Sequence, residues 1–151
     1  MKITLLCLLF SSLFFSINAQ EISPDIIDID IFGTPPDFNY DTISDYETTK
    51  IANNAIRIDI DTKEKGYHLY FRSDGPIRTS SGQKIPESKF GLRIHNTIQV
   101  LPLSSNNDHL LIAMSNKNQE SYSLDFIVSP LYFDYDPGNY TVNILFTLTK
   151  N

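Results

Sequence analysis

Apolar and polar residues alternate strictly over the last stretch of the chain, directly behind a Pro-Gly pair at positions 137 and 138. The apolar positions are Tyr140, Val142, Ile144, Phe146 and Leu148, and most residues between them are threonine or asparagine. A period of two, rich in β-branched and aromatic residues, predicts a β-strand with one face in a core.

Similar alternation recurs at short intervals upstream, and turn-forming residues separate the runs. No window has a sustained helical period, so the pattern predicts an all-β fold, an immunoglobulin-like two-sheet antiparallel sandwich. The predicted strands lie around Ile56–Ile60, Tyr67–Arg72, Phe90–Ile94, Ile98–Leu101, Leu110–Met114, Tyr122–Val128 and the final run. The predicted core contains Ile56, Ile58, Ile60, Leu69, Phe71, Leu124, Phe126, Val128, Ile144, Phe146 and Leu148.

The N-terminus has the three regions of a secretory signal peptide. Lys2 provides a positive start, Ile3 to Phe15 is almost wholly apolar, and Ala19 is a small residue before Gln20. We predict a signal peptide over residues 1–19, and export to the periplasm, the cell surface or the extracellular space. The apolar run is shorter than a spanning helix requires, so no membrane span is expected after cleavage. Cys7 would leave with the leader, which excludes disulfide and thiolate chemistry from the mature chain.

Residues 20–49 differ from the rest because they are acidic and contain no lysine or arginine. Ile27, Ile29 and Ile31 alternate with aspartates and are followed by a Gly-Thr-Pro-Pro break. We interpret this segment as an N-terminal strand and an acidic linker, ahead of a β-sandwich domain over residues 50–151. The isoleucine face must be buried, either in the chain's own sheet or as a strand donated to a neighbouring subunit.

The formal net charge is −6, and loss of Lys2 with the leader would make the mature chain more negative still. The remaining lysines and arginines are scattered along the sequence. An acidic chain without a basic patch is repelled by phosphate backbones, so we expect no nucleic-acid partner.

No residue pattern indicates catalysis. The only imidazoles are His68, His95 and His109, and no nucleophile elbow, zinc-protease motif or phosphate loop accompanies them. We therefore predict a non-enzymatic protein without a cofactor.

Calcium would require several close oxygens, and three groups of residues provide some. They are Asp28 with Asp30, Asp59 with Asp61, and Asp134 with Asp136 and Asn139. Solvated strand faces and ordinary turn chemistry explain them without a metal, and we predict no metal site. Asn139-Tyr140-Thr141 also fits the N-glycosylation pattern, although a turn asparagine is the simpler interpretation.

Exposed aromatic side chains could bind sugars by stacking. Tyr70, Tyr132 and Tyr135 are the candidates for such a platform, although the chain has no tryptophan. Core packing and cross-strand pairing are the competing explanation for aromatic residues on strands.

The run from Pro137-Gly138-Asn139-Tyr140-Thr141 to Leu148-Thr149 resembles the C-terminal strand of bacterial surface β-sandwich proteins. The most similar group is that of chaperone–usher pilins and spore-coat-U-like proteins, with a looser likeness to WxL-type wall-binding domains. Gly138 stands where pilins carry a glycine, whereas Lys150 occupies a position that is commonly aromatic in pilins. The resemblance implies that Ile27, Ile29 and Ile31 form a donor strand that completes the sheet of another surface subunit.

Together these patterns predict an exported, non-enzymatic structural or adhesive surface protein, pilin-like in character. An extracellular carbohydrate-binding module is the alternative, with glycans in place of other subunits as partners.

Overall fold

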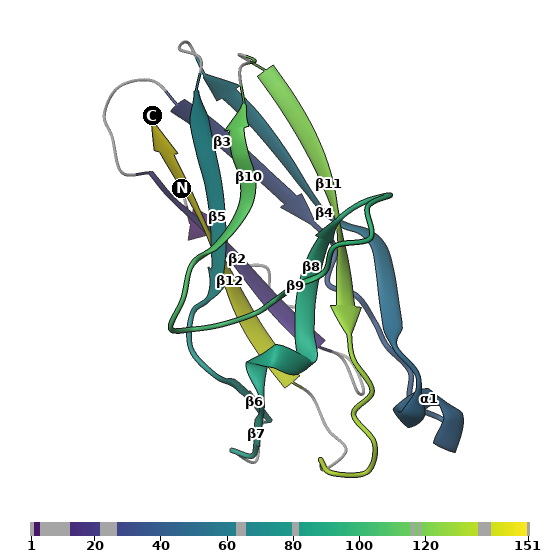
Figure 1. The fold of residues 1–151 in the computed structure, drawn as a ribbon. Helices are drawn as coiled ribbons and strands as arrows, with labels where there is room; N and C mark the ends of the chain where they lie inside the picture. Colours follow the sequence, from purple (N-terminus) through teal and green to yellow (C-terminus); the bar gives the residue numbers. More distant parts are fainter. Residues whose placement is uncertain are drawn as a thin grey trace.

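The chain folds into two β-sheets that pack face to face as a sandwich (Figure 1). The computed structural model describes residues 2–3, 13–21, 27–62, 66–79, 82–115, 117, 119–135 and 140–150. The all-β prediction is confirmed, and so is the division into two sheets.

The first sheet has seven strands, of which five follow the order β1-β2-β12-β5-β10, while β6 pairs with β12 and β7 pairs with β6. All its pairs are antiparallel except β2 with β12, which run parallel. Its strands are β1 (Lys2–Ile3), β2 (Leu13–Glu21), β5 (Tyr67–Ser73), β6 (Ile77–Thr79), β7 (Lys84–Ile85), β10 (His109–Ser115) and β12 (Tyr140–Lys150).

The second sheet has five strands in the order β3-β4-β11-β8-β9, and all its pairs are antiparallel. Its long central strands are β4 and β11, which pair over most of their length. The strands are β3 (Ile27–Gly33), β4 (Lys50–Thr62), β8 (Phe90–Ile94), β9 (Leu101–Pro102) and β11 (Gln119–Val128).

The core lies between the sheets and is built from every second residue of the long strands, because successive side chains of a strand point to opposite faces. All the core residues expected from the sequence are buried. Phe38, which lies in the predicted linker, is also buried in this core. The segment after β3 therefore packs on the sandwich.

Two short helices interrupt the β-structure: α1 (Ile43–Glu47) and the 3-10 turn η1 (Glu87–Lys89). A capping box of Thr42 and Asp45 starts α1. The backbone N–H of Thr42 donates to Asp45 Oδ2 at 2.8 Å, and Thr42 Oγ1 donates to the same oxygen at 2.7 Å. In the described residues, no helix is long and apolar enough to cross a membrane.

The prediction of a strand over Ile98–Leu101 is wrong for most of its length, because only Leu101 belongs to a strand. Asn96 has a left-handed backbone, with φ of 64°, and Thr97 closes the turn onto the Ile94 carbonyl. Ile98 is 97% exposed, so the apolar alternation here faces solvent.

Candidate functional site

An exposed group of aromatic rings lies at one end of the sandwich, where the loop after β11 meets α1 (Figure 1). The backbone N–H of Tyr132 donates to the Tyr46 carbonyl at 2.9 Å and ties the two segments together. The Tyr46 ring centroid lies 5.2 Å from that of Phe133 and 5.0 Å from that of Tyr40. We call this surface, made of Tyr40, Tyr46, Tyr132 and Phe133, the aromatic end.

Two rings of the aromatic end face solvent and are held in fixed positions. Tyr132 is 50% exposed and Phe133 is 64% exposed. Tyr132 has a left-handed backbone with φ of 52°, a conformation that is uncommon outside glycine and often found at binding sites. Lys89 Nζ lies 5.3 Å from the Tyr132 ring centroid and donates to the Pro130 carbonyl at 2.9 Å. These contacts present the exposed rings before any ligand arrives.

The inner part of the aromatic end is supported by charges. Lys50 Nζ lies 5.5 Å from the Tyr40 ring centroid and is also bonded to the Asp45 carboxylate. Burial of Tyr40, with smaller contributions from Tyr46 and Asp45, raises the pKa of Tyr40 to about 12. Its hydroxyl therefore stays protonated and remains a possible hydrogen-bond donor.

The predicted sugar platform is not assembled as one surface. Tyr132 belongs to the aromatic end, while Tyr135 is half-buried against the core. Tyr70 lies on the outer face of β5, opposite Leu110 and Thr147, in the seven-stranded sheet. Tyr40 and Tyr46 were missed because they precede the predicted sandwich domain, and nothing in their local sequence indicates that α1 folds back against the loop after β11.

The proposed donor strand is paired within its own chain in this structure. β3 pairs with β4 in continuous register from Ile27 opposite Thr62 to Gly33 opposite Ile56. Ile31 is 8% exposed and Ile29 is half-buried against the core. These two isoleucines thus find their burial in the chain's own sandwich.

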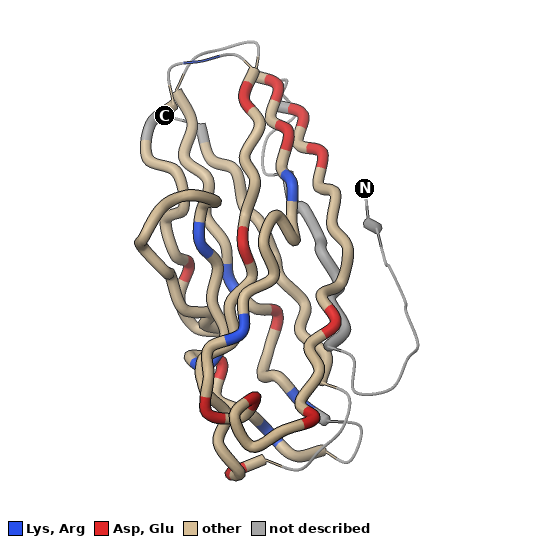
Figure 2. The backbone as a smooth tube through the Cα atoms, turned by 90° about the vertical axis from the view of Figure 1, so that its right-hand side faces the viewer, with Lys and Arg blue, Asp and Glu red and all other residues tan. Residues whose placement is uncertain are grey.

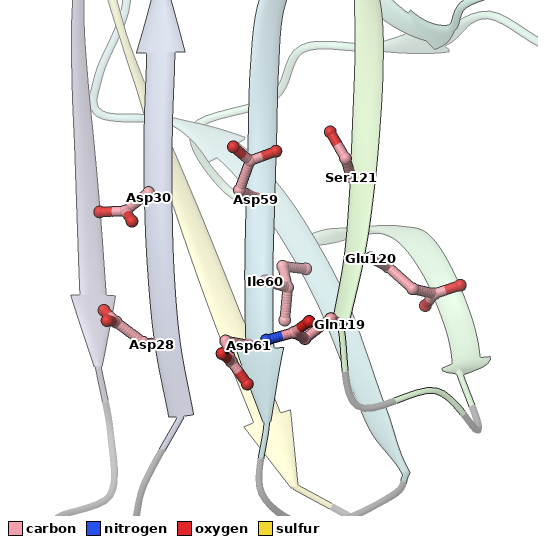
Figure 3. Close-up of a pocket in the computed structure, with 8 residues that line it drawn as sticks. All are labelled: Asp28, Asp30, Asp59, Ile60, Asp61, Gln119, Glu120 and Ser121. Atoms are coloured by element: carbon pink, nitrogen blue, oxygen red, sulfur yellow. Dashed lines mark hydrogen bonds between the residues drawn. The ribbon is translucent and has the colours of Figure 1, made fainter.

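Four aspartates lie at opposed positions of β3 and β4 on the outer side of the five-stranded sheet (Figures 2 and 3). Asp28 lies opposite Asp61, and Asp30 lies opposite Asp59. With Gln119 and Ser121 of β11 they line an open concavity of about 450 Å³. We call this surface, made of Asp28, Asp30, Asp59 and Asp61, the acidic face.

Among the described residues, Asp59 and Asp61 of the acidic face have side-chain partners. Arg57 Nη2 lies 2.7 Å from Asp59 Oδ2, and Gln119 Nε2 donates to Asp61 Oδ2 at 2.8 Å. Within the described residues no group of acidic, histidine or cysteine side chains is arranged to hold a metal ion. Of the third candidate calcium group, Asp134 is exposed in the loop after β11, whereas Asp136 and Asn139 lie outside the described residues.

A polar cluster joins the two sheets near one end of the core. The hydroxyls of Tyr67 on β5 and Tyr122 on β11 each donate to Glu120 Oε2 at 2.5 Å, and Ser115 of β10 also bonds this oxygen. Burial opposes ionisation of Glu120, but the hydroxyl donors and Lys117 outweigh it and lower its pKa to about 2. Burial, and donation to Glu120, raise the pKa of both tyrosines. The Glu120 carboxylate is thus stabilised as an anion and is a poor base.

A second polar cluster surrounds Asp125, which has no exposed area. Its Oδ1 accepts from the Asn54 backbone N–H at 3.0 Å and lies 2.8 Å from His95 Nδ1. Its Oδ2 accepts from Arg93 Nε at 3.0 Å and Arg93 Nη2 at 2.6 Å. Burial raises the pKa of Asp125, but these donors reverse the effect and lower it. A carboxylate with so many donors is suited to fixing backbone geometry.

The three histidines occupy different environments. His68 lies on β5 with its ring centroid 6.1 Å from that of Tyr70, and the His109 ring centroid lies 5.7 Å from that of Phe71. His95 follows β8 and contacts Asp125. The structure does not place the three on one surface patch, and each has a packing or hydrogen-bonding role of its own.

The chain matches no known protein-family model, and no curated protein is significantly similar to it in sequence.

Proposed function

We propose that this chain is an exported, non-enzymatic structural or adhesive protein of the cell surface. The signal-peptide pattern at residues 1–19 supports export, and the C-terminal resemblance to pilin-like sandwiches supports a surface role. The observation that carries the adhesive part of the proposal is the aromatic end.

The aromatic end suits adhesion because exposed, rigid tyrosine and phenylalanine rings bind partners at a low entropic cost. Tyr132 and Phe133 are both at least half exposed, although burying rings of this size would stabilise a fold. The left-handed backbone of Tyr132 and the Lys89 ammonium group beside its ring hold this residue in place. Aromatic side chains that stay exposed and are held in a fixed position are typical of a binding site.

The polar clusters favour a non-enzymatic protein. Glu120 and Asp125 are the most strongly bonded carboxylates, and each accepts at least three hydrogen bonds. Both carboxylates are held in the anionic form, so neither is tuned to exchange protons near neutral pH. Their hydrogen bonds serve the fold.

A carbohydrate-binding module remains the second candidate, and the same rings favour it. Tyr132 offers an exposed ring to a pyranose, and the neighbouring Phe133 ring packs on Tyr46 with centroids 5.2 Å apart. The adhesive and carbohydrate-binding candidates differ in the ligand that the rings contact.

An array of immobilised glycans and extracellular proteins tests both candidates with the exported protein. Saturable binding is expected, and Tyr132→Ala with Phe133→Ala should weaken it at least about tenfold, as truncation of central aromatic residues does in other interfaces. Tyr70→Ala, on the outer face of the seven-stranded sheet, is the control and should bind as the unmodified protein does. Binding confined to glycans would select the carbohydrate-binding module. Binding that is indifferent to the Tyr132 and Phe133 substitutions would contradict both candidates.

A further inference from the structure

The β2 strand spans the predicted signal-peptide cleavage site. β2 runs parallel to β12, with Leu13 opposite Tyr140 and Glu21 opposite Leu148. Ala19 lies opposite Phe146, so cleavage after Ala19 would leave only Gln20 and Glu21 beside β12. The edge of β12 from Tyr140 to Phe146 would then lack a neighbour on that side.

The other edges of the sandwich have features that prevent pairing with another chain. β3 has Asp28 and Asp30 along its length, and β9 is only two residues long. β10 is bulged, since its register with β5 shifts between Leu110 and Ile112 and again between Ile112 and Ser115. Charges, short strands and bulges are the usual protections of a sheet edge.

β12 has none of these protections. From Tyr140 to Thr149 it contains no charged residue, proline or glycine. Its register with β5 runs without a shift from Ile144 to Lys150. An unprotected, regular edge of this length is a template for another strand. Because the edge carries no charge, a second copy of the same edge can approach it without local repulsion.

The middle residue of the vacated edge has an unsatisfied side chain. Asn143 is the central position between Tyr140 and Phe146, and in the described residues its Oδ1 is buried without a hydrogen-bond partner. Leaving such a group unpaired destabilises a protein.

We propose that leader removal opens the β12 edge and that a second copy of the chain fills it, pairing residues Tyr140–Phe146 of both copies antiparallel around Asn143. This inference rests on the leader cleavage that is part of the proposed function. A two-fold axis at Asn143 places the two asparagine amides opposite each other, where each can donate to the other's Oδ1. It also aligns the remaining strands of the two sheets, β12, β5, β10, β6 and β7 of each copy, into one continuous sheet. Until cleavage, β2 occupies the edge and keeps the chain monomeric.

The test compares two forms of the full-length gene product. One is exported by a bacterial host, and its first residue is read by mass spectrometry. The other is made in the cytoplasm, where the leader is retained. Light scattering after size exclusion should show a dimer for the exported form beginning at Gln20 and a monomer for the form that retains β2. A monomeric Gln20 form, or a dimeric form that retains β2, would overturn the pairing.

A charged substitution at the proposed axis tests the geometry. Asn143→Asp keeps the size of the side chain but places two carboxylates opposite each other, so the dimer should dissociate at least about tenfold more readily. Leu110→Asp, on the other edge of the same sheet, is the control and should leave the dimer intact. Circular dichroism confirms that each variant is folded. If Asn143→Asp does not fold, hydrogen exchange decides instead: those amides of residues 140–146 that point away from β5 and β6 should be protected in the exported unmodified protein, and their rapid exchange would overturn the proposal.

An exported chain that keeps residues 13–19 would contradict the cleavage, and with it both the export model and this proposal. An exported Gln20 chain that stays monomeric would overturn the pairing alone and leave the proposed function intact. A dimer that Asn143→Asp does not weaken would place the contact elsewhere and equally defeat the proposal.

Discussion

Asp125 is the residue through which β11 is bonded to both of its neighbours in the five-stranded sheet. Its carboxylate bonds the Asn54 backbone on β4 and the Arg93 side chain on β8, while Asp125 itself lies on β11. Asn54 has a left-handed backbone with φ of 53°, and the register of β4 with β11 shifts beside it, between Leu124 and Phe126. The carboxylate thus satisfies the amide of a β-bulge that interrupts the sheet ladder.

Removing this carboxylate should destabilise the fold strongly. Asp125→Ala leaves the Arg93 guanidinium, which is 21% exposed, without its counter-charge and leaves the Asn54 amide without an acceptor. Breaking a buried pair in this way costs about 3–5 kcal/mol, and the partial exposure of Arg93 favours the lower value. Urea unfolding should therefore show a loss of about 3 kcal/mol in the free energy of unfolding. Asp59→Ala, which breaks the solvent-exposed pair with Arg57, is the control and should change stability little. If the two substitutions lowered the free energy of unfolding equally, Asp125 would not stabilise the β-bulge in the way described.

At the scale of elements, Glu120 connects strands of both sheets. Tyr67 of β5 and Ser115 of β10 come from the seven-stranded sheet, whereas Glu120 and Tyr122 come from β11 of the five-stranded sheet. Because the Glu120 pKa is lowered from 4.5 to about 2, its contribution to stability is complete above pH 4.5 and is lost as the pH falls through 2. The pKa values of Tyr67 and Tyr122 are raised, so the pH dependence has the opposite sign. The contribution of these two tyrosines to stability is complete below pH 10 and is lost as the pH rises further.

The acid side of this dependence gives a measurable prediction. Between pH 7 and pH 3 the Glu120 contribution should fall by about 2 kcal/mol, as proton linkage gives for such a pKa difference. Urea unfolding at the two pH values measures the change. Glu120→Gln should be less stable than the unmodified protein at pH 7 and should lose about 2 kcal/mol less on acidification. The variant isolates this residue because the other carboxylates are unchanged. An identical acid loss in both proteins would show that Glu120 does not join the sheets in the way described.

The sequence predicted the elements that are long enough to show a period. β4, β5, β11 and β12 each repeat an apolar residue at every second position, and this pattern records which face is buried. β6, β7 and β9 have only two or three residues, too few for a period to be recognised. α1 has five residues, and its capping box of Thr42 and Asp45 was the available signal.

The polar clusters and the aromatic end could not be predicted, because their members meet only through strand register and loop packing. Glu120 and Tyr67 are far apart in sequence, and nothing local indicates that β5 and β11 approach each other. One signal was present for Asp125. It interrupts the apolar run Leu124 to Val128, and a charge inside such a run calls for buried partners.

At the scale of the whole molecule, acidic residues are distributed unevenly. The formal net charge is −6, and the acidic face concentrates four aspartates on β3 and β4 (Figure 2). Like charges placed directly opposite on neighbouring strands destabilise a sheet. These residues nevertheless suit an edge strand, because charges on β3 discourage pairing with other chains. The molecule thus keeps the β3 edge closed to association while β12 carries no such charge.

This repulsion makes stability depend on salt. Sodium chloride screens exposed charges, so raising it from low to physiological ionic strength should raise the melting temperature by about 2–4 °C. The double variant Asp28→Asn with Asp30→Asn should melt higher than the unmodified protein at low salt and respond less to added salt. Differential scanning calorimetry measures both effects.

A matched double variant separates local repulsion from net charge. Asp41→Asn with Asp134→Asn removes two exposed carboxylates outside the acidic face, so it changes the net charge equally. It should keep most of the salt response, because the cross-strand pairs of β3 and β4 remain. If both double variants lost the salt response equally, the response would come from the net charge and not from the opposed aspartate pairs.

Calcium chloride at matched ionic strength should act as sodium chloride does, because calcium ions near a solvated strand face screen the carboxylates without being coordinated by them. A larger shift with calcium, abolished by Asp28→Asn with Asp30→Asn, would contradict that expectation and show that the acidic face binds the ion.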